Sequence, residues 1–342
     1  MLGANLRKSP ESERVTANIA FTVSPGEGGQ RLDRFLTLKM RGLSRSRVTS
    51  FIKNDLRMES SDAALKPSRI VRADETYVLR YEKTVKTEPD FPLSILFEDE
   101  NLLIIDKPPG QLVHPTRTSV KNTLIDRVRE HAGGAPCLAH RLDRETSGIL
   151  VIAKNSEAAR LMGNMFKAHK VRKTYRAIVF GDMDEDSGVI DMPIGRDTRS
   201  AVAVKQMAGK AGFAQAVTRF EAESRFGGFT LARLMPETGR LHQIRVHMAH
   251  IGHPLVGDKI YGPDERLYLE FIENGFTPRH LDILLMDRHA LHASEIEFVH
   301  PVTGAQVSVG SPLPPDMAEF MTRHSGCPIA SISLKISKNA SI

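Results

Sequence analysis

One short stretch brackets an acid with two cations. In HRLDRETSG, residues 140–148, Asp143 stands between Arg141 and Arg144. Positive neighbours lower the pKa of a carboxyl group and keep it ionised, as a nucleophile must be. A Thr-Ser-Gly turn and an apolar run follow, so we expect Asp143 on a loop at the edge of a buried strand, where reactive groups are commonly mounted. A structural ion pair that fixes the loop is the alternative.

A second stretch, ETGRLHQIRVHMAHIGHPLVGDKIYG, combines a helical pattern with basic side chains. Its apolar residues recur at helical spacing: Leu241, Ile244, Met248 and Ile251. This spacing predicts a helix over 240–251 that stops at the following glycine. Arg240 and His242 would lie in the first turn, where backbone amides and the helix dipole favour an anion. Arg245 follows three residues after His242.

The same stretch raises the question of a metal, because it holds four histidines: His242, His247, His250 and His253. Their positions in the sequence differ by five, three and three, which is not the spacing of a zinc-binding HExxH helix. No nearby cysteine or pair of carboxylates completes a shell, and Asp258 is interpreted as a loop acid. The sequence therefore predicts no metal site, and these histidines would face RNA or the core.

Tyr175 is a third candidate, in the strand-like stretch RKTYRAIVFG. A tyrosine on a strand beside cations can stack on a nucleobase and offer its hydroxyl group. The alternative is a half-buried tyrosine that only packs within the sheet.

The elements that must position these residues alternate in type. Buried strands are expected in NLLIIDKPPG and GILVIAKN, helices in TLIDRVREHAGG and in SEAARLMGNMFKAHK with Ser156 as its cap, and a strand in KTYRAIVFG that exposes one face to the core. Further strands are expected at 214–224, 229–235 and 290–299. The pattern predicts a mixed α+β domain.

Composition narrows the class of protein. The chain has 342 residues, 41% of them hydrophobic, and a formal net charge of +6, which points to an anionic partner. Two cysteines cannot build a disulfide framework and are typical of a reducing compartment. We see no secretory signal and no apolar run of the roughly 20 residues that cross a bilayer, so we expect a cytoplasmic protein without membrane contact.

The positive charge is concentrated near the N-terminus. Residues 30–57 are predicted to form two helices, and 31–57 hold eight Lys or Arg against two Asp, an excess equal to that of the whole chain. Local charge of this kind suits a phosphate backbone, with Arg45 and Arg47 as candidate contacts. A solvated basic helix face is the alternative. The expected organisation runs as follows: a flexible arm at 1–18, a small RNA-binding domain at 19–82, a linker at 83–94, a catalytic domain at 95–325 and a tail at 326–342.

Taken together and in order, these stretches resemble the RluA family of pseudouridine synthases. The likeness covers about 95 to 310 and includes LLIIDKPPGQLVHP, HRLDRETSGILVIAK, KTYRAIV, GRLHQIRVHMAHIGHPLVGDKIYG and RHALHASEIEFVHPVTG. Residues 30–80 resemble more weakly the small αL-motif RNA-binding domain of a small-subunit ribosomal protein, through RLDRFL and LSRSRV. The chain then departs from that pattern, with NDLRMESSDAALKPSR in place of the usual glycine turn and hairpin.

The resemblance implies an α+β pseudouridine-synthase fold whose mixed, largely antiparallel central sheet carries an RNA-binding cleft. It implies an isomerase that moves uracil from an N1 to a C5 glycosidic bond within RNA, with no cofactor and no metal. Asp143 would be the nucleophile, Arg245 its partner, and Tyr175 the residue that stacks on uracil. Arg141 would approach the flipped nucleotide.

The candidate RNA contacts are His140, Arg141, Arg144, Arg240, His242, Arg45 and Arg47. We expect a monomer without an obligate protein partner that acts on large-subunit ribosomal RNA. Transfer RNA, alone or in addition, is the alternative substrate. A catalytically silent RNA-binding assembly factor and a metal-dependent RNA hydrolase are the rival functions.

Overall fold

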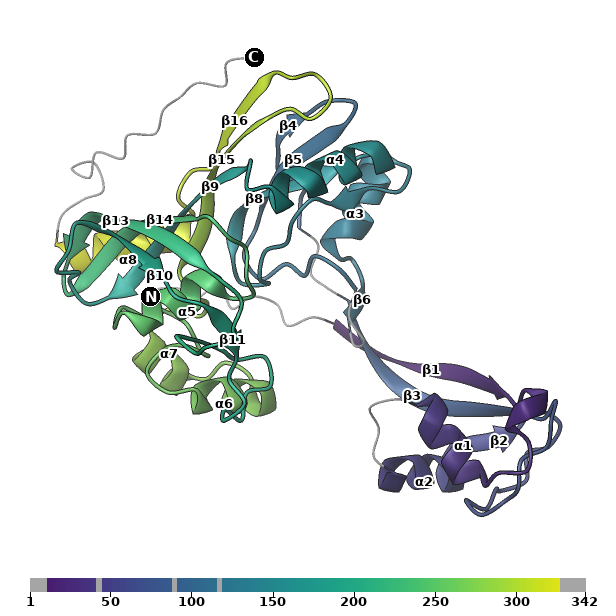
Figure 1. Cartoon of the computed structure of the whole chain (residues 1–342). Coiled ribbons are helices and arrows are strands. Elements are labelled where there is room, and N and C mark those ends of the chain that lie inside the picture. Colours follow the sequence, from purple (N-terminus) through teal and green to yellow (C-terminus); the bar gives the residue numbers. More distant parts are fainter. Residues whose placement is uncertain (1–10, 41–44, 88–90, 116–118, 327–342) are drawn as a thin grey trace. The chain divides into compact units, whose positions relative to one another are not determined.

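The computed structural model describes residues 11–40, 45–87, 91–115 and 119–326. The chain divides into two compact units (Figure 1). The small unit comprises Met1–Pro89 and Pro115–Lys121, and the large unit comprises Asp90–His114 and Asn122–Ile342. No helix within the described ranges is long and apolar enough to span a membrane.

The small unit packs helices and a sheet around one apolar core. Its elements are β1 (Glu11–Thr22), η1 (Pro25–Glu27), α1 (Leu32–Lys39), α2 (Arg45–Asn54), β2 (Leu56–Met58), β3 (Thr76–Thr87) and β6 (Ser119–Lys121). Both predicted helices are present. Their apolar faces meet in this core through Leu32, Phe35, Leu36, Val48 and Ile52.

Two boundaries of this unit differ from the sequence expectation. Residues 11–18, expected in a flexible arm, belong to β1, and residues 83–87, expected in a linker, belong to β3. The two strands pair in antiparallel register along their full length, from Glu11 opposite Thr87 to Thr22 opposite Thr76. Backbone pairing with a distant segment holds these polar stretches extended, and no local pattern reports it. Residues 1–10, 88–90 and 327–342 of the expected arm, linker and tail lie outside the described residues.

The large unit is built on a mixed sheet. Among the described residues its strand order is β10-β13-β14-β9-β15-β8-β5-β4, with β16 beside β15 and β7 beside β8. The bounds are β4 (Ile95–Glu98), β5 (Leu102–Lys107), β7 (Cys137–Leu138), β8 (Ser147–Ala153), β9 (Arg172–Phe180), β10 (Ser187–Asp191), β13 (Val217–Phe226), β14 (Phe229–Pro236), β15 (Leu291–Val299) and β16 (Gln306–Gly310). The pairing of β15 with β8 is parallel and the other pairings are antiparallel. The predicted α+β fold with a largely antiparallel sheet is confirmed.

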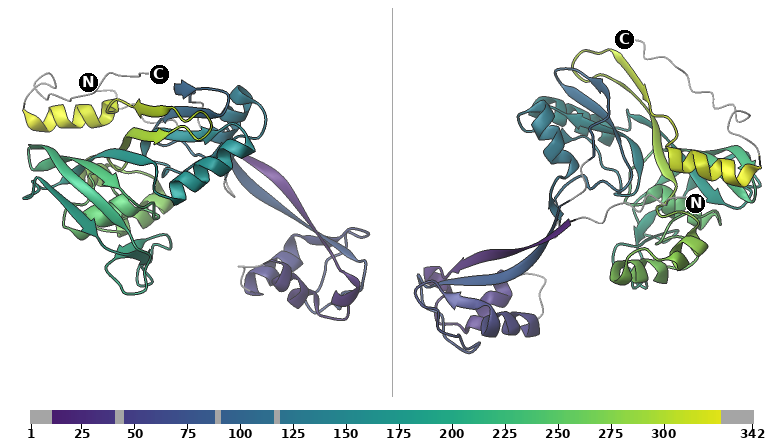
Figure 2. Two further views of the ribbon diagram at one scale, coloured as in Figure 1. Left: turned by 45° about the horizontal axis from the view of Figure 1, so that its top comes forward. Right: turned by 180° about the vertical axis from the view of Figure 1, so that it is seen from behind.

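The large unit also contains helices, of which α4, α5 and α8 contact the sheet, and a short two-stranded ribbon that is separate from it. The helices are α3 (Leu124–Ala132), α4 (Ser156–Lys167), α5 (Gln243–His250), α6 (Arg266–Asn274), α7 (Pro278–Leu284) and α8 (Pro315–Ser325); the ribbon pairs β11 (Ile194–Arg196) with β12 (Gln206–Ala208). α8 contacts β13 (Figure 2). β9 is buried on both faces rather than on one: Tyr175 and Ala177 join a core with α5, whereas Ile178 joins a second core with α8.

Two helix starts also differ from the sequence expectation. α4 is capped by Asn155, whose side-chain oxygen accepts the backbone N–H of Ala158 at 2.9 Å, so the expected cap Ser156 is already helical. α5 begins at Gln243 and not at 240. The chain cannot be helical at His242, because this residue has φ 57°, in the left-handed region. Arg240 and His242 therefore precede the helix.

Candidate active site

The loop that carries Asp143 is held from both sides. Asp143 lies between β7 and β8, and its backbone carbonyl accepts the N–H of Thr146 at 3.1 Å in a turn. On one side Lys107, fully buried, donates to the carbonyl of Arg144 at 3.0 Å. On the other side the Thr146 hydroxyl contacts Nε2 of His289 at 2.8 Å. A loop fixed in this way positions its carboxylate without help from a ligand.

Gly148 lies within β8, where it lets this strand pass close to β15. The turn after Asp143 is made by Arg144 and Glu145, so the expected Thr-Ser-Gly turn is wrong, because Ser147 and Gly148 already pair within the sheet. Gly148 has φ 104°, and a Cβ atom there would lie 2.2 Å from the carbonyl oxygen of Ala293. A residue with a side chain would push the two strands apart at the point where the Asp143 loop enters β8.

Asp143 forms an ion pair with Arg245, 102 residues away in the sequence. The Arg245 Nη1 group donates to Asp143 Oδ2 at 3.0 Å. Burial opposes ionisation of Asp143, but Arg245, assisted by His242 and His289, holds the pKa of this carboxyl group below its usual value. The Asp143 side chain keeps 22% of its surface exposed. An ionised and partly accessible carboxylate is what a nucleophile requires.

Asp258 anchors the same arginine from the other side. Its carboxylate accepts Nε of Arg245 at 2.6 Å and Nη2 at 2.8 Å, and it also accepts the backbone N–H groups of Ile260 and Tyr261. Asp258 lies in a loop, as expected, and it is fully buried there. Gly257, with φ 79°, lets the chain pass the backbone of Arg288 at this point. Asp258 therefore holds the Arg245 guanidinium group in the position from which it pairs with Asp143.

Tyr175 lies close enough to Asp143 for the two groups to affect each other. Only 9% of Tyr175 is exposed. Burial raises the pKa of Tyr175, and the negative charge of Asp143 adds to this effect, so the hydroxyl keeps its proton throughout the neutral range. Tyr175 is thus a buried sheet residue that shares an electrostatic environment with the candidate nucleophile.

The cations beside Asp143 have different surroundings. The Arg141 side chain is exposed and makes no hydrogen bond or ion pair with another described residue. The Arg144 side chain donates to the carbonyl of Gly110 at 2.9 Å and so helps to hold the loop. His140 accepts the backbone N–H of Val151 at 3.1 Å, and burial lowers the pKa of this histidine to about 3. Among these three residues, Arg141 is the one whose exposed side chain has no such contact.

The remaining candidate contacts fall into two places. Arg240 is exposed and donates to the carbonyl of Gln215 at 2.9 Å. His242 lies in the site itself, with Nε2 at 3.8 Å from Asp143 Oδ2. Arg45 and Arg47 belong to the small unit, where Arg45 donates to the buried Asp33 at 3.0 Å. The structure therefore brings only His242 of these four to Asp143 within the large unit.

Two other histidines of the second stretch, His247 and His253, contact backbone and side-chain groups away from Asp143, whereas His250 is exposed. His247, fully buried, contacts the Thr218 hydroxyl and the carbonyl of Met192, both at 2.9 Å. His253 contacts the carbonyl of Phe180 at 3.0 Å. Among the residues that the structure describes, no three His, Cys, Asp or Glu side chains are grouped to hold a metal ion.

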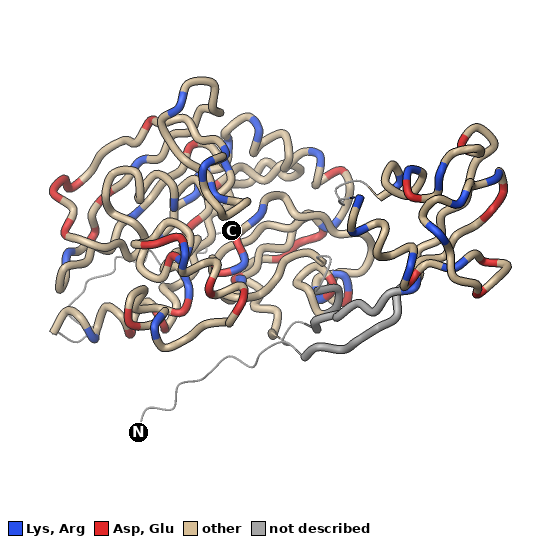
Figure 3. The backbone as a smooth tube through the Cα atoms, turned by 90° about the horizontal axis from the view of Figure 1, so that it is seen from below, with Lys and Arg blue, Asp and Glu red and all other residues tan. Residues whose placement is uncertain are grey.

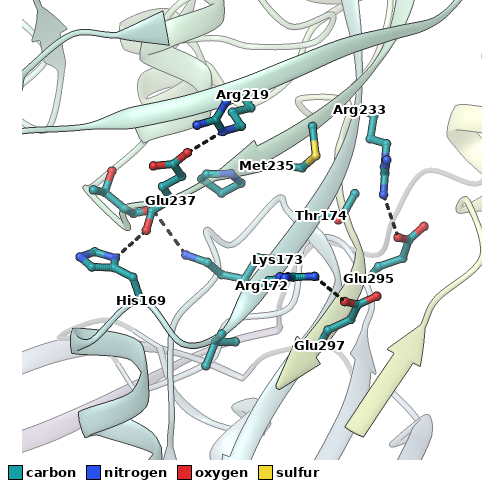
Figure 4. Close-up of a pocket in the computed structure, with 13 residues that line it drawn as sticks. His169, Arg172, Lys173, Thr174, Arg219, Arg233, Met235, Glu237, Glu295 and Glu297 are labelled. Atoms are coloured by element: carbon teal, nitrogen blue, oxygen red, sulfur yellow. Dashed lines mark hydrogen bonds and ion pairs between the residues drawn. The ribbon is translucent and has the colours of Figure 1, made fainter. Parts of the chain in front are cut away.

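A separate pocket of about 650 Å³ lies where β9, β14 and β15 run side by side (Figure 4). Arg219, Arg233 and Arg172 line it, and each forms an ion pair with a glutamate of the same pocket: Glu237, Glu295 and Glu297. Asp143, Tyr175 and Arg245 are not among its lining residues. Each of these arginine charges is balanced by a glutamate of the same pocket. Since the candidate catalytic residues do not line it, this pocket is not the candidate active site.

Comparison with known proteins identifies the family to which this chain belongs. Residues 101–250, which include Asp143, Tyr175 and Arg245, match the family model described as RNA pseudouridylate synthase. The chain is 39% identical over 304 residues to the ribosomal large subunit pseudouridine synthase D of Pseudomonas aeruginosa, covering 84% of this chain and 90% of that protein. The chain belongs to the RNA pseudouridylate synthase family. It is therefore an isomerase that acts on uridine in RNA, and the resemblance to pseudouridine synthases noted in the sequence is confirmed.

Further relatives of this synthase support the assignment. The Escherichia coli ribosomal large subunit pseudouridine synthase D is 35% identical over 318 residues, covering 89% of this chain and 93% of its own. An uncharacterised RNA pseudouridine synthase of Bacillus subtilis is 35% identical over 314 residues, covering 89% and 97%. The solved structure of human RNA pseudouridylate synthase domain containing 1 superposes with a TM-score of 0.53 at 27% identity, over 67% of this chain and 89% of that one.

Sequence reasoning missed several buried partners in the synthase. Glu145, in the same loop as Asp143, accepts Lys259 at 2.8 Å and lies 3.3 Å from Nδ1 of His289. Tyr261 packs its ring under the guanidinium of Arg245, 5.0 Å from the ring centroid. The signal that could have found them is the density of polar residues in HRLDRETSG and GDKIYG, each a short loop between apolar segments.

Proposed function

We propose that this synthase isomerises uridines of large-subunit ribosomal RNA and that Asp143 is its nucleophile. The observation that carries the proposal is the pairing of Asp143 with Arg245, which two segments distant in the sequence build together. The relatives from Pseudomonas aeruginosa and Escherichia coli carry a ribosomal large subunit name and align over most of this chain, which supports the substrate.

The reaction exchanges one bond for another. The C1′–N1 bond of uridine breaks, a C1′–C5 bond forms, C5 loses its proton and N1 gains one. Whether the carboxylate attacks C1′, attacks C6 or assists a route through a glycal, Asp143 must be ionised at the start. Arg245 provides that charge state and fixes the orientation of the carboxylate.

No oxidant, reductant or hydrolytic water enters this balance. We therefore propose that the side chains of the site suffice, without a cofactor. Tyr175 contributes an aromatic ring and a protonated hydroxyl beside Asp143, where a flipped uracil would stack. Arg141, exposed next to the nucleophile, would pair with a phosphate or fill the space that the flipped base leaves.

The small unit supplies RNA affinity in this proposal. Figure 3 shows the Lys and Arg positions along its backbone. Three of its cations form ion pairs: Arg31 and Arg45 share Asp33, and Lys39 pairs with Glu27. Arg34 and Lys53 are exposed on α1 and α2 and have no ion pair among the described residues. Cations of this kind bind a phosphate backbone through counterion release.

The test is to map pseudouridines in ribosomal and transfer RNA from cells with and without the gene. Deletion should remove pseudouridine from large-subunit ribosomal RNA. A plasmid-borne wild-type gene should restore it, whereas Asp143→Asn should not. Loss confined to transfer RNA would contradict the proposed substrate, and restoration by the Asp143→Asn variant would contradict the proposed nucleophile.

A further inference from the structure

Tyr261 and His242 form a hydrogen-bonded pair at the edge of the site. The Tyr261 hydroxyl accepts the backbone N–H of Gln206 and contacts Nδ1 of His242, each at 2.9 Å. The opposite ring nitrogen of His242, Nε2, faces Asp143 Oδ2 at 3.8 Å. Three segments of the large unit thus meet in one chain of contacts: the strand β12, the turn that contains Tyr261 and the turn that precedes α5.

The protons in this chain of contacts can be assigned by counting donors. Burial, helped by the charge of Arg245, lowers the pKa of His242 to about 4, so the imidazole is neutral and carries one proton near pH 7. A carboxylate facing Nε2 favours an N–H there and disfavours a lone pair. Nδ1 is then an acceptor, and Tyr261 must donate its single proton to it. The N–H of Gln206 points at the Tyr261 oxygen and leaves the hydroxyl proton free for this role.

The backbone conformation of His242 indicates that the placement of its imidazole is required by the surrounding structure. His242 adopts φ 57°, a left-handed conformation that residues other than glycine seldom take and that carries a cost in free energy. The turn that contains His242 leads directly into α5, whose Arg245 pairs with the same carboxylate oxygen. Asp143 Oδ2 thus faces two donors, while Oδ1 accepts no hydrogen bond from any described residue.

We propose that Tyr261 is a positioning residue for pseudouridine formation: its hydroxyl fixes the tautomer of His242 so that Nε2–H and Arg245 together hold Asp143 Oδ2 and leave Oδ1 as the reacting oxygen. This inference rests on the proposed role of Asp143. It assigns a function to a tyrosine that touches neither the nucleophile nor the substrate. The competing explanation is that Tyr261 only packs in the apolar cluster that it shares with Val246 and Ile260.

Tyr261→Phe tests this inference, with Tyr268→Phe as the matched control. Tyr268 packs against the same apolar cluster, and its hydroxyl makes no hydrogen bond to another residue that the structure describes. Activity is measured as tritium released from RNA labelled at uridine C5, because that position loses its hydrogen in the reaction. We expect Tyr261→Phe to lower kcat/KM by about tenfold, the effect of one oriented hydrogen bond, and Tyr268→Phe to leave it unchanged.

The pH profile separates positioning from packing. The groups that face Asp143 are Arg245 and His242, His289 from the segment before β15, and the hydroxyls of Tyr175 and Tyr261. Below the His242 pKa of about 4 both ring nitrogens carry a proton, so Tyr261→Phe should match the wild type there. Above that pH the imidazole is neutral and its tautomer is no longer fixed in Tyr261→Phe, so the loss in kcat/KM should appear as pH rises through this pKa. A variant that only packs less well would lose thermal stability without this pH dependence.

Two substitutions of His242 complete the test. Glutamine places an N–H group near the position of Nε2, whereas asparagine reaches only the position of Nδ1, so His242→Gln should retain more activity than His242→Asn. The double variant Tyr261→Phe/His242→Asn should be no slower than His242→Asn alone, because both changes remove the same donor. Equal pH profiles for Tyr261→Phe and Tyr268→Phe, or additive losses in the double variant, would overturn the inference.

These outcomes are distinct from failure of the proposed function. If Asp143→Asn remains active, the role of the nucleophile is wrong and the positioning role falls with it. If Asp143→Asn is inactive while Tyr261→Phe matches the wild type in rate and pH profile, only the positioning role is wrong.

Discussion

Replacing Asp143 with asparagine should separate chemistry from stability. The amide has the same size as the carboxyl group, but it cannot act as an ionised nucleophile. Loss of a nucleophile typically lowers kcat on the order of 10⁴-fold or more, which is at least about 5 kcal/mol of activation free energy. The fold should survive, because Arg245 keeps both of its hydrogen bonds to Asp258.

The loss of stability expected for Asp143→Asn follows from the contacts that the substitution changes. The asparagine side chain is not charged, but its amide oxygen can still accept the hydrogen bond from Arg245, which measures 3.0 Å in the wild type. The Asp143 side chain is also 22% exposed, so water replaces part of what is lost. The net cost should be about 1 kcal/mol, or about 2–4 °C in Tm for a unit of this size.

The matched comparison is Asp258→Asn, which changes the other carboxylate of the same arginine. Asp258 is fully buried, and removing one partner of a buried ion pair typically costs about 3–5 kcal/mol. Its Tm should fall by more than about 6 °C. Both variants are measured by tritium release and by thermal melting. Activity of Asp143→Asn within tenfold of the wild type, or a Tm as low as that of Asp258→Asn, would refute the division between chemistry and support.

Three more predictions concern the charge of the site, metal dependence and RNA binding. Arg245→Gln should lose nearly as much activity as Asp143→Asn. Because the arginine lowers the pKa of Asp143 and the ionised form reacts, the residual kcat/KM of Arg245→Gln should show an acid limb at higher pH than that of the wild type. An unchanged acid limb would exclude the pairing. The purified enzyme should keep full activity in excess EDTA, because the isomerisation needs no Lewis acid; inhibition that zinc or magnesium reverses on an unstructured substrate would contradict this. Arg34→Gln/Lys53→Gln should weaken binding to structured ribosomal RNA and reduce the salt dependence of that binding, with little change in the single-turnover rate at saturating RNA. Equal salt slopes for the variant and the wild type would show that α1 and α2 do not engage RNA.

The sequence alone determined the elements whose pattern is local. The apolar runs of β5 and β8, the amphipathic α4 and the helices of the small unit follow from spacing, because a buried strand or a helix face repeats within a few residues. The bracketing of Asp143 by Arg141 and Arg144 singled out this acid as a candidate, but the cation that holds its pKa down is Arg245. Motifs in fixed order also gave the family, which the comparisons confirm.

Tertiary structure decided the partners of these residues. No spacing rule joins Asp143 to Arg245 across 102 residues, or reveals that the loop acid Asp258 is buried and anchors this arginine. The extended course of residues 11–18 likewise depends on backbone pairing with β3, a distant segment. The conformation of His242 breaks the helical pattern that its neighbours follow. Local patterns report which surfaces a segment must bury, whereas the identity of the group that meets a buried charge is fixed only when the distant segments pack together.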